Sequence, residues 1–422
     1  MADAMNGNRS ILVVGGGMSG LSAATEAAEA GFQVYLVEKE PYLGGRVARM
    51  NKYFPKLCPP NCGLEINFRR IKNNPLIRFF TMSEVEKIDG EAGNFDVTIK
   101  TRPRYINEKC TGCGQCAEAA ESEIENPFNY GLDKVKAAYL PHEFAFPMRY
   151  MVAPEVIGTP EAEKIKAACL YDAVDLAMQP QQFDLKVGAV IWATGWQPYD
   201  AAKILYYGFG KNKNVITNVM MERLAAFNGP TQGKIVRPSD GGDVKKIAFV
   251  QCAGSRDENH LPYCSGVCCL ASLKQATYLL EQNPEASATI FYIDIRALGK
   301  YEDFYVKVQS DERVSLIKGK AGEITEDPQT GLVTVQVEDQ ATGRILKDQF
   351  DLVVLATGMV PSTAAGKIPA DAAYDEHGFV LGSQPVQGII GAGCVNKPVD
   401  VSSSVQDATA AALKAIQATC RR

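Results

Sequence analysis

The sequence has no run of apolar residues long enough to cross a lipid bilayer, and it has no tract of basic residues. A membrane-spanning helix needs about 18 or more apolar residues in succession, and no window of the 422-residue chain approaches this. The formal net charge is −5, which gives no reason to expect a nucleic-acid partner. Residues 1–9 are polar and lack the apolar core of a signal peptide. We therefore expect a cytoplasmic protein that does not itself span a membrane.

Histidine is also scarce, whereas cysteine is abundant. The three histidines, His142, His260 and His377, stand apart from one another, and we interpret them as structural. A disulfide-rich secreted protein would be short and would carry a signal segment. In a reducing compartment, clustered cysteines more often bind metal or take part in redox chemistry. The twelve cysteines are Cys58, Cys62, Cys110, Cys113, Cys116, Cys169, Cys252, Cys264, Cys268, Cys269, Cys394 and Cys420.

The first forty residues have the pattern of a dinucleotide-binding unit. A buried strand is predicted over 10–14, followed by a turn with Gly15, Gly17 and Gly20, an alanine-rich helix and a second strand over 33–37. The first glycine permits the tight turn, the second lets the backbone approach a pyrophosphate, and the third lets the helix pack closely on the strand.

The start of this helix and the end of the second strand supply the remaining contacts. The free N–H groups at the helix N-terminus, around Met18 and Ser19, are suited to a phosphate. Glu38 follows the second strand, where its carboxylate can accept hydrogen bonds from ribose hydroxyls, and Lys39 lies beside it. Strand, turn, helix, strand and acid in this order predict a doubly wound α/β domain that binds a dinucleotide.

The sequence also contains an internal repeat. Residues 183–195 and 350–358 each read as a strand that ends in Ala-Thr-Gly, and each is preceded by a β segment, over 95–100 and 333–338. Such a repeat indicates two related nucleotide-binding units. The second unit opens with a strand over 246–251, but the glycine turn that should follow this strand is absent.

An insertion separates the first β segment from its strand and extends from about residue 102 to residue 182. We therefore expect a dinucleotide-binding domain in three parts, interrupted first by the insertion and then by a degenerate second unit. The parts are 1–101, 183–243 and 350–422 for the dinucleotide-binding domain, 102–182 for the insertion and 244–349 for the second unit.

Further motifs indicate which dinucleotide is bound. Leu43-Gly44-Gly45-Arg46 forms another glycine turn, Ala193-Thr194-Gly195 follows a buried strand, and Gly391-Ala392-Gly393-Cys394 lies late in the chain. These segments resemble two-dinucleotide-binding flavoproteins of the thioredoxin reductase and glutathione reductase kind. The resemblance implies FAD, with the last helix, from about residue 402, directing its dipole at the flavin ring. The FAD contacts it implies are Gly15, Gly17, Met18, Ser19, Gly20, Glu38, Lys39, Gly44, Gly45, Arg46, Val85, Ala193, Thr194, Gly195, Gly358, Gly393, Cys394 and Ser403.

The segment that replaces the second glycine turn is rich in cysteine. It carries Cys252, Cys264, Cys268 and Cys269, and it leads into a helix predicted over 270–280. Four thiolates are the full ligand set of a cubane iron–sulfur cluster. The spacing is not that of a ferredoxin, so four buried thiols remain an alternative on spacing alone.

The residues around these cysteines, QCAGSRDE over 251–258 and PYCSGVCC over 262–269, closely resemble the A subunit of heterodisulfide reductase. The resemblance implies that the four cysteines bind an unusual [4Fe-4S] cluster near the flavin. It also implies that Lys274 lies close to N5 of the flavin and is catalytic. A cation at that place would stabilise negative charge on a reduced flavin. The alternative is that Lys274 is a solvated helix residue.

The insertion contains half of a ferredoxin motif. Cys110, Cys113 and Cys116 match the first three cysteines of C-x2-C-x2-C-x3-C-P, but Ala120 stands at the fourth position. In two-cluster ferredoxins the fourth cysteine of each run ligates the other cluster. Cys169 resembles the tail of a second run whose first three cysteines are missing. We predict one [4Fe-4S] cluster on these four cysteines, the alternative being a degenerate insertion that binds nothing.

Two weaker features follow the second glycine turn and the ferredoxin half-motif. Cys58 and Cys62 lie where disulfide reductases of this fold place a redox disulfide, but three residues separate them instead of four, and two of the three are prolines. We expect a structural or interfacial role, and an auxiliary ligand role stays open. The aromatic stretch 139–147 is expected to cover the insertion or to meet a partner.

Heterodisulfide reductase A subunits are typically longer and carry further cluster domains. A flavin core with a one-cluster insertion resembles the A subunits of the quinone-interacting membrane-bound oxidoreductase complexes of sulfate reducers. The resemblance implies an oxidoreductase subunit with FAD and [4Fe-4S] clusters, which faces the cytoplasm and is held at the membrane by other subunits. Those partners would be a quinone-reactive membrane subunit together with a second subunit that carries flavin and iron–sulfur clusters. The chain would relay electrons between menaquinol and adenylylsulfate reductase.

Three other functions stay open at this point. The chain could be a flavin-bifurcating subunit of the heterodisulfide reductase type. An NAD(P)H-dependent disulfide reductase or oxidase is disfavoured because the second glycine turn is absent. A non-catalytic assembly subunit would hold a flavin that is redox-inert.

Overall fold

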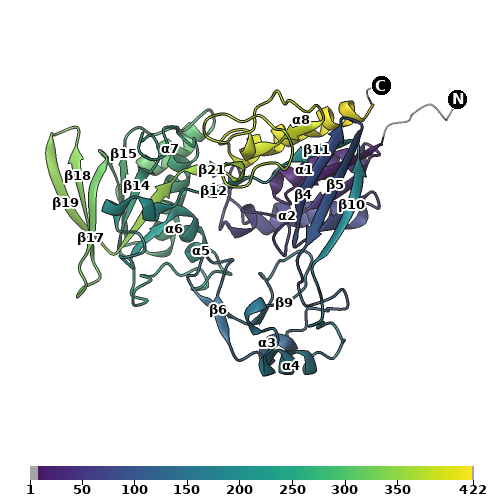
Figure 1. The fold of residues 1–422 in the computed structure, drawn as a ribbon. Coiled ribbons are helices and arrows are strands. Elements are labelled where there is room, and N and C mark those ends of the chain that lie inside the picture. Colours follow the sequence, from purple (N-terminus) through teal and green to yellow (C-terminus); the bar gives the residue numbers. More distant parts are fainter. Residues whose placement is uncertain (1–7, 421–422) are drawn as a thin grey trace.

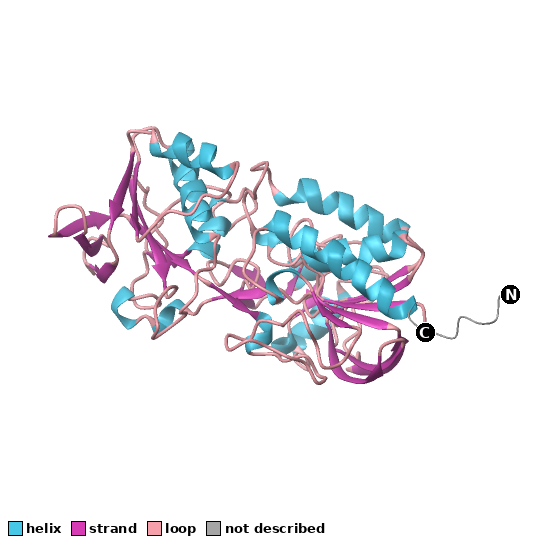
Figure 2. Cartoon of the chain, turned by 90° about the horizontal axis from the view of Figure 1, so that it is seen from above, coloured by secondary structure: helices cyan, strands magenta, loops and turns pink. Residues whose placement is uncertain are grey.

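The computed structural model describes residues 8–420 of the chain. Two α/β halves lie side by side, and the insertion lies below them in the view of Figure 1. Figure 2, seen from above, shows a sheet with helices packed against it in each half. None of the helices in residues 8–420 has the length and apolar character that crossing a membrane requires.

The first half is built on a five-stranded parallel sheet with the order β22-β11-β1-β2-β3. Ile11 of β1 lies opposite Val34 of β2 on one side and opposite Ala189 of β11 on the other. Unbroken apolar strands such as ILVV are suited to a parallel sheet that is covered on both faces. The strands are β1 (Ser10–Val14), β2 (Gln33–Val37), β3 (Ile77–Phe80), β11 (Ala189–Trp192) and β22 (Ile389–Gly391).

Two different layers cover the faces of this sheet. Ile11 and Val13 pack against the helices, whereas Leu12 and Val14 pack against a small antiparallel sheet, as the two-residue alternation of a strand requires. The helices are α1 (Met18–Glu29), α2 (Pro60–Asn73) and α8 (Val401–Cys420). The antiparallel sheet has the order β10-β5-β4 and consists of β4 (Ser83–Glu91), β5 (Asn94–Thr101) and β10 (Gln181–Val187).

The second half repeats this plan. Its parallel sheet has the order β13-β20-β14-β15-β16, so β20 lies beside β14 as β11 lies beside β1. The strands are β13 (Val215–Thr217), β14 (Lys246–Ala253), β15 (Ser287–Tyr292), β16 (Val314–Lys318) and β20 (Leu352–Thr357). The helices are α5 (Asn218–Ala225), α6 (Cys268–Gln282) and α7 (Tyr301–Gln309). The outer antiparallel sheet contains β17 (Ala321–Glu326), β18 (Val333–Asp339) and β19 (Arg344–Phe350).

The halves are joined directly after the two repeated Ala-Thr-Gly segments, 193–195 and 356–358. There β12 (Trp196–Pro198) pairs antiparallel with β21 (Met359–Pro361). The sheets do not follow the sequence-based division at two points, because β13 comes from 183–243 and β20 from 350–422, yet both join the second sheet. A buried apolar strand carries no sign of which of two neighbouring sheets it will enter, so the sequence pattern could not distinguish them.

The insertion leaves and re-enters the first half at adjacent strand ends. Thr101, at the end of β5, pairs with Gln181, at the start of β10. Its own elements are short: β6 (Glu123–Glu125), β7 (Lys134–Lys136), β8 (Ala138–Tyr139), β9 (Met151–Val152), α3 (Gln115–Ala119) and α4 (Pro160–Ala167). They pack around a separate small core that contains Cys116 and Ile165, with Cys110 and Cys169 against it.

A buried arginine ties the insertion to both halves. Arg223 of α5 is fully buried, and its Nε donates to the Asn129 side chain of the insertion at 2.7 Å. Its Nη2 donates to the carbonyl oxygen of Asn228 at 2.9 Å, and its Nη1 donates to the carbonyl oxygen of Arg49 in the first half at 3.5 Å. The guanidinium also lies over the ring of Phe128, 4.6 Å from its centroid. One side chain therefore connects three parts of the chain.

The aromatic stretch 139–147 packs on the first half. Phe146 stacks on Phe68 of α2 with ring centroids 5.0 Å apart, and its carbonyl oxygen accepts from the Leu43 N–H at 2.8 Å. His142 stacks on Phe128 with centroids 4.4 Å apart. Burial lowers the pKa of His142 to about 3, so its ring is neutral and serves as an aromatic packing group.

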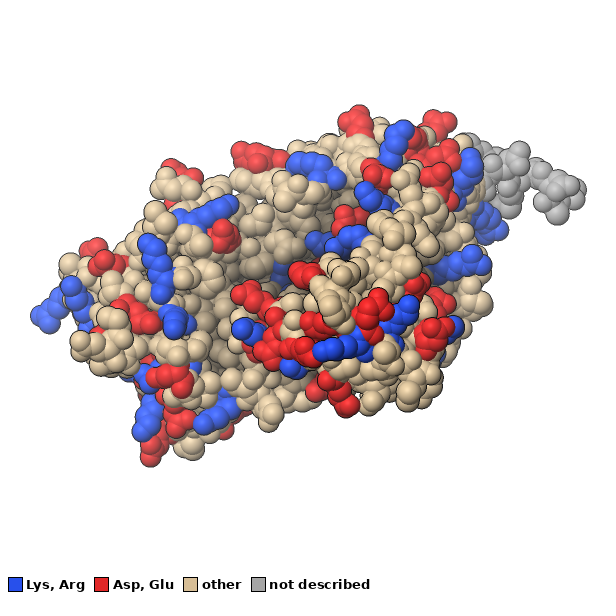
Figure 3. All heavy atoms as spheres, turned by 60° about the horizontal axis from the view of Figure 1, so that its bottom comes forward, with Lys and Arg blue, Asp and Glu red and all other residues tan. Residues whose placement is uncertain are grey.

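The surface of the insertion is acidic. Residues 102–182 carry twelve acidic and eight basic side chains, a net charge of −4 against −5 for the whole chain. Figure 3 shows this face, with Asp and Glu side chains prominent over the insertion and a hollow beside it. The charge of the molecule is therefore concentrated on its smallest part.

Candidate flavin cavity and cysteine clusters

The glycines between β1 and α1 are required by close contacts. Gly15 has a φ of +105°, which glycine adopts without strain. A Cβ at Gly15 would lie 2.4 Å from the carbonyl oxygen of Ala193, and a Cβ at Gly20 would lie 1.7 Å from the carbonyl oxygen of Gly15. A Cβ at Gly45 would lie 2.8 Å from the Cα of Gly17. The two glycine turns therefore face one another and leave their backbone open to a diphosphate.

Glu38 stands at the end of β2 and is buried. Its Oε2 accepts a hydrogen bond from the Gly16 N–H at 2.6 Å, and its Oε1 accepts one from the Glu40 N–H at 2.8 Å. An ionised carboxylate offers about four acceptor sites, so about two remain for ribose hydroxyls. Burial raises the pKa of Glu38 to about 7, although the two backbone N–H groups act in the opposite direction.

A cavity of about 690 Å³ begins at the glycine turn and extends between the two halves. Two buried polar groups at its wall, Nε1 of Trp192 and Oγ1 of Thr194, have no hydrogen-bond partner among the described residues. The donor and acceptor groups at the wall therefore fit a bound dinucleotide. The predicted FAD contacts that line the cavity are Gly15, Gly17, Met18, Ser19, Glu38, Lys39, Gly45, Arg46, Val85, Ala193, Thr194, Gly195, Cys394 and Ser403.

Four other predicted FAD contacts do not line this cavity. Gly20 allows α1 to pack closely on the Gly15 carbonyl. Gly44 joins the two glycine turns, because its N–H donates to the carbonyl oxygen of Gly16 at 2.8 Å. The Gly393 N–H donates to the Asp407 carboxylate at 2.6 Å. Gly358 follows the end of β20 in the second half, so its position associates it with the cysteines of that half instead of with the flavin cavity.

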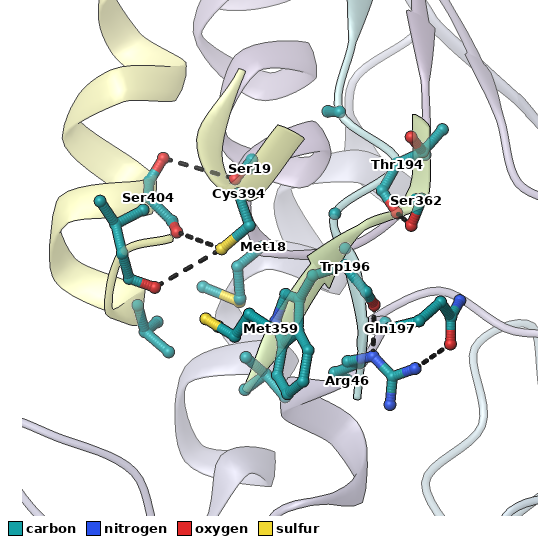
Figure 4. Close-up of a pocket in the computed structure, with 18 of the residues that line it drawn as sticks. Met18, Ser19, Arg46, Thr194, Trp196, Gln197, Met359, Ser362, Cys394 and Ser404 are labelled. Atoms are coloured by element: carbon teal, nitrogen blue, oxygen red, sulfur yellow. Dashed lines mark hydrogen bonds between the residues drawn. The ribbon is translucent and has the colours of Figure 1, made fainter. Parts of the chain in front are cut away.

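Arg46 forms part of the cavity wall. Its Nε donates to the carbonyl oxygen of Trp196 at 2.6 Å, its Nη1 donates to the Tyr130 hydroxyl at 3.2 Å, and its Nη2 donates to the Gln197 side chain. Its guanidinium lies over the Trp196 ring, 4.7 Å from the centroid. Figure 4 shows this group beside Met359 and Met18. Most N–H groups of Arg46 already donate to protein atoms. Arg46 therefore stabilises the cavity wall and offers few free donors to a phosphate.

The N-terminus of α8 meets the opposite side of the cavity, where Figure 4 shows Ser19, Cys394 and Ser404 grouped together. The Cys394 thiol lies 3.5 Å from the Ser404 hydroxyl, and the Ser19 hydroxyl donates to the carbonyl oxygen of Ser404 at 3.4 Å. Burial raises the pKa of Cys394, so this thiol is neutral and acts as a small apolar wall group.

Lys274 lines the cavity from α6, and it is buried, so the alternative of a solvated helix residue is wrong. Its Nζ lies 3.0 Å from Oε1 of Glu222 and donates to the carbonyl oxygen of Lys52 at 2.5 Å. Glu222, on α5, also accepts from the Gln275 side chain at 2.7 Å and from the Tyr278 hydroxyl at 3.2 Å. Sequence reasoning missed Glu222, because nothing in α5 marks it as different from a surface acid.

The cysteines of the second half come from three consecutive segments. Cys252 lies in β14 at a register shift between Val250 and Ala253, and its φ of +54° is unusual for a residue with a side chain. Cys264 lies in the following loop, and Cys268 and Cys269 form the first turn of α6. Backbone held in a sparsely populated conformation at a bulge is common next to functional sites.

These four thiols are near neighbours in a buried place. Burial and the nearby thiols of Cys269 and Cys264 raise the pKa of Cys252 to about 11. Burial together with the other three thiols raises the pKa of Cys268 well above its usual range. Cys252 and Cys268 are therefore neutral thiols in the free chain, and binding a metal group would have to displace their protons.

The arrangement does not fit a single metal ion. Within residues 8–420, no three His, Cys, Asp or Glu side chains converge as ligands of one ion do. A [4Fe-4S] cluster uses four cysteine thiolates, bound to different irons, so its ligands surround a volume instead of a point. Four neighbouring thiols fit that donor set, and buried polar atoms of Gln251 and Ser255 without a partner lie in the adjoining chain.

The predicted quartet of the insertion is also brought together. Burial and the thiols of Cys110, Cys113 and Cys169 raise the pKa of Cys116 to about 11. Cys116 is buried in α3, Cys113 is exposed, and the other two are partly buried. Gly112 and Gly114 have φ values of +76° and +88°, which lets the chain wind between the cysteines.

Cys169 has an environment that favours a thiolate. Its burial raises the pKa, but backbone N–H groups of Ala173, Tyr171 and Val174 lower it, and the net pKa is below the ordinary value. The Ala173 N–H donates to the Cys169 sulfur at 3.3 Å. Because the thiolate is the form that ligates iron, this position suits the ligand role predicted for it.

All twelve cysteines are free thiols in this structure. Cys62 lies in the first turn of α2 and is exposed, whereas Cys58 is partly buried and its carbonyl oxygen accepts from the Tyr53 N–H at 3.2 Å. No disulfide joins them. Their surroundings are those of a loop that closes one end of α2.

The chain is similar to known flavoproteins. Residues 10–53 match the family model described as FAD dependent oxidoreductase. The chain is 41% identical over 420 residues to the iron-sulfur A subunit of a CoB--CoM heterodisulfide reductase of Methanopyrus kandleri, covering 96% of this chain and 64% of that protein. It is 36% identical over 417 residues to the A subunit of the H(2):CoB-CoM heterodisulfide,ferredoxin reductase of Methanothermobacter marburgensis, covering 96% of this chain and 63% of that protein.

Solved structures of similar fold include thioredoxin reductases. The enzyme from T. acidophilum has a TM-score of 0.52 at 16% identity and covers 97% of this chain and 98% of its own. The enzyme from Lactococcus lactis has a TM-score of 0.53 at 14% identity and covers 97% and 99%. At this identity the likeness concerns the fold alone.

The fold is that of the two-dinucleotide-binding, thioredoxin reductase-like flavoproteins, and the segment with the first two glycine turns matches the family model of FAD-dependent oxidoreductases. Over 96% of its length the chain is similar to the A subunits of heterodisulfide reductase. It spans less than two thirds of the length of these relatives.

Proposed function

We propose that the chain is an electron-transfer subunit that holds FAD in the cavity and [4Fe-4S] clusters on the two cysteine quartets. The observation that carries this proposal is the position of α6. Its first turn contains Cys268 and Cys269, and Leu270 and Lys274 of the same helix line the cavity. A group bound by the cysteines and a flavin in the cavity would therefore be neighbours, as one-electron transfer between them requires.

FAD supplies exchange of electrons in pairs or singly, and each cluster supplies transfer of one electron at a time. The chain's own part is to bind, orient and shield. The glycine turns and the start of α1 hold the diphosphate, and Glu38 holds the ribose. Lys274 brings an ammonium group to the cavity wall, but Glu222 compensates its charge at 3.0 Å. The effect of Lys274 on a flavin is therefore that of an oriented donor more than that of a free cation.

We propose that partner proteins, and not NAD(P)H, exchange electrons with this chain. In the second half the strand β14 leads into Cys252, whose φ is +54°, where a glycine turn for a second dinucleotide would begin. The insertion offers a different route, because its exposed Cys113 lies on an acidic module. A partner with a basic face would be steered to that module.

For the biological setting, we propose a cytoplasm-facing subunit that other subunits hold at a membrane, and that relays electrons between menaquinol and adenylylsulfate reductase. Its support is the one-cluster insertion and the sequence resemblance to subunits of sulfate reducers. A second candidate is a heterodisulfide reductase-type, flavin-bifurcating subunit. The identity of 36–41% to proteins named as A subunits of heterodisulfide reductases favours it.

The first experiment is anaerobic iron and flavin quantitation with EPR spectroscopy of the dithionite-reduced chain. Two occupied quartets correspond to about eight irons per FAD, and one to about four. Cys113→Ser and Cys268→Ser, each expected to lose one set of irons, assign the signals. Protein with intact FAD and no iron would contradict the proposal and favour a disulfide reductase, which rapid flavin reduction by NADH would then identify.

The biological setting has its own test. The reduced chain is mixed anaerobically with oxidised adenylylsulfate reductase, and reoxidation of the flavin is followed by its absorbance. Rapid reoxidation supports the relay in sulfate respiration. If a heterodisulfide reductase partner is reduced and adenylylsulfate reductase is not, the second candidate is correct.

A further inference from the structure

Three buried side chains around the cysteines of the second half have no hydrogen-bond partner among the described residues. They are Gln251, with both of its amide atoms unpaired, and Ser255 and Ser272, each with an unpaired hydroxyl. Their exposed fractions are 3%, 2% and 0%. An unpaired buried polar group costs about 1–3 kcal/mol, and such groups in native proteins call for a specific explanation, such as an unseen ion.

Ser255 lies in the loop between the first two cysteines of the quartet. Its N–H donates to the carbonyl oxygen of Cys252 at 3.2 Å. Its hydroxyl oxygen is 2.2 Å from the place that a Cβ on Gly358 would occupy, and the Ser265 hydroxyl is 3.0 Å from the same place. Because Ser265 follows Cys264, the Ser255 hydroxyl lies among residues that adjoin two of the four cysteines.

Gly358 connects this hydroxyl to a third cysteine. The carbonyl oxygen of the preceding residue, Thr357, accepts from the Cys268 thiol at 3.5 Å. Gly358 has no positive φ, so the backbone does not require glycine there. What requires glycine is the space for Ser255, since a methyl group at 358 would displace the hydroxyl.

Gln251 and Ser272 approach from the sheet and from the helix. Ile247 and Phe249 of β14 pack against α6, and strand alternation places Gln251 on the same face, directly before Cys252. Ser272 lies on α6, one helical turn beyond its two cysteines, and is fully buried. The three unpaired groups therefore come from the strand, the loop and the helix that supply the thiols.

We propose that Ser255, Gln251 and Ser272 donate hydrogen bonds to sulfur atoms of the cluster that the quartet binds, and that they raise its reduction potential. This inference rests on the proposed function, because it needs a cluster at these cysteines. Reduction adds an electron to a group already bound by four thiolates, so neutral donors stabilise the reduced form more than the oxidised form. The three residues position and tune the cluster without binding iron.

The test is an EPR-monitored redox titration of the anaerobic full chain and of Ser255→Ala and Gln251→Leu. Each variant is expected to keep its iron and FAD and to favour reduction about tenfold less, which for a one-electron couple lowers the midpoint potential by about 59 mV. Thr289→Val is the matched control, since Thr289 is a buried hydroxyl residue in the neighbouring strand β15, and its midpoint potential should equal that of the wild type.

The outcomes are separable. Full iron content with an unchanged midpoint potential in both variants overturns the inference and leaves the proposed function standing. A wild-type chain without iron at this quartet overturns the proposed function itself. If Ser255→Ala loses the cluster, Ser255→Thr decides: recovery of the iron supports a hydroxyl donor, and continued loss shows that only the shape of the side chain matters.

Discussion

Among ion pairs of the described residues, Lys274 and Glu222 form the most deeply buried one, with side chains 6% and 8% exposed. Glu222 accepts from four donors in all, the Lys274 ammonium, the Gln275 amide, the Tyr278 hydroxyl and the Asn51 N–H. These donors together use the acceptor sites of the Glu222 carboxyl group. At the scale of single residues, Glu222 is therefore what allows a lysine to stand at the cavity wall.

Replacing Glu222 by alanine should destabilise the chain strongly. It leaves the ammonium of Lys274 buried without a countercharge, a change that costs about 3–5 kcal/mol in buried pairs. The free energy of unfolding is measured by urea denaturation of the anaerobic protein. The double variant Glu222→Ala with Lys274→Met should lose less than the two single variants together. Strictly additive losses would show that the two residues are not coupled.

If Glu38 binds the ribose of FAD as proposed, we expect FAD binding to depend on pH. Its pKa of about 7 in the free chain means that it is mostly protonated below neutral pH. Ribose hydroxyls donate best to the carboxylate form, so binding FAD must release this proton. The affinity for FAD should therefore rise with pH up to about 7 and then level off, with at most a tenfold change per pH unit for one proton.

This dependence is measured by fluorescence titration of the apoprotein with FAD between pH 5.5 and pH 8.5, a range of about three units chosen around the pKa of Glu38. Glu38→Gln should bind more weakly and show a flat profile in this range. A profile for Glu38→Gln with the same slope as the wild type would assign the proton to another group.

Sequence alone could place residues that belong to a continuous motif, and it missed those whose role comes from another segment. Glu38 and the glycines belong to a strand–turn–helix pattern, which sets their spacing and predicts their role. Glu222 acts because α5 packs on α6, and no local pattern contains that contact. For the same reason Arg46 follows a motif for diphosphate, yet its donors are held by Trp196 and Gln197.

At the scale of elements, strands were easier to place than helix ends. The strands predicted over 10–14 and 33–37 have these bounds in the structure. The helix predicted over 270–280 begins at Cys268 and ends at Gln282. Helix ends have no fixed hydrophobic pattern, and α6 begins without a side-chain cap. This small difference matters, because it puts two of the cysteines inside the helix.

Because α1 packs closely on β1, a side chain at Gly20 should disturb the turn between them and weaken FAD binding. Gly20→Ala places a methyl group where the Gly15 carbonyl oxygen lies only 1.7 Å away. The turn must shift, at a cost of about 1–3 kcal/mol or more, and FAD affinity should fall by at least about tenfold. The loss of FAD affinity is measured as the FAD content of the purified variant. Gly382→Ala is the control, since nothing lies within 4 Å of its Cβ, and equal FAD loss in both variants would contradict the argument.

At the scale of the whole molecule, polar contacts of Arg223 are among those that join the three parts. Burial lowers the pKa of Arg223 to about 10, so the guanidinium remains charged at neutral pH. It has no carboxylate in direct contact among the ion pairs of the described residues, and its partners are the Asn129 side chain and the carbonyl oxygens of Asn228 and Arg49. The junction is therefore strong only while every partner is in place.

Arg223→Met should loosen the insertion more than it unfolds the halves. It leaves the buried Asn129 oxygen without its donor, at about 1–3 kcal/mol, and removes a donor from the half-buried Asn228 carbonyl. Limited proteolysis should then cut within 102–182 sooner than in the wild type. Arg69→Met is the control, because Arg69 forms only an exposed pair with Glu65, worth about 0–1 kcal/mol. Unchanged cleavage in Arg223→Met would show that other contacts hold the insertion.

The pairing of Thr101 with Gln181 has a consequence for the history of this chain. Since the two strand ends are already adjacent, a tight hairpin turn of about two residues could replace everything between them without moving the sheet. The insertion is thus a module that could be gained or lost as a unit, because both of its ends join the first half at the same place. Related proteins could gain the insertion, lose it or change its cysteines, while the rest of the chain evolved under separate constraints.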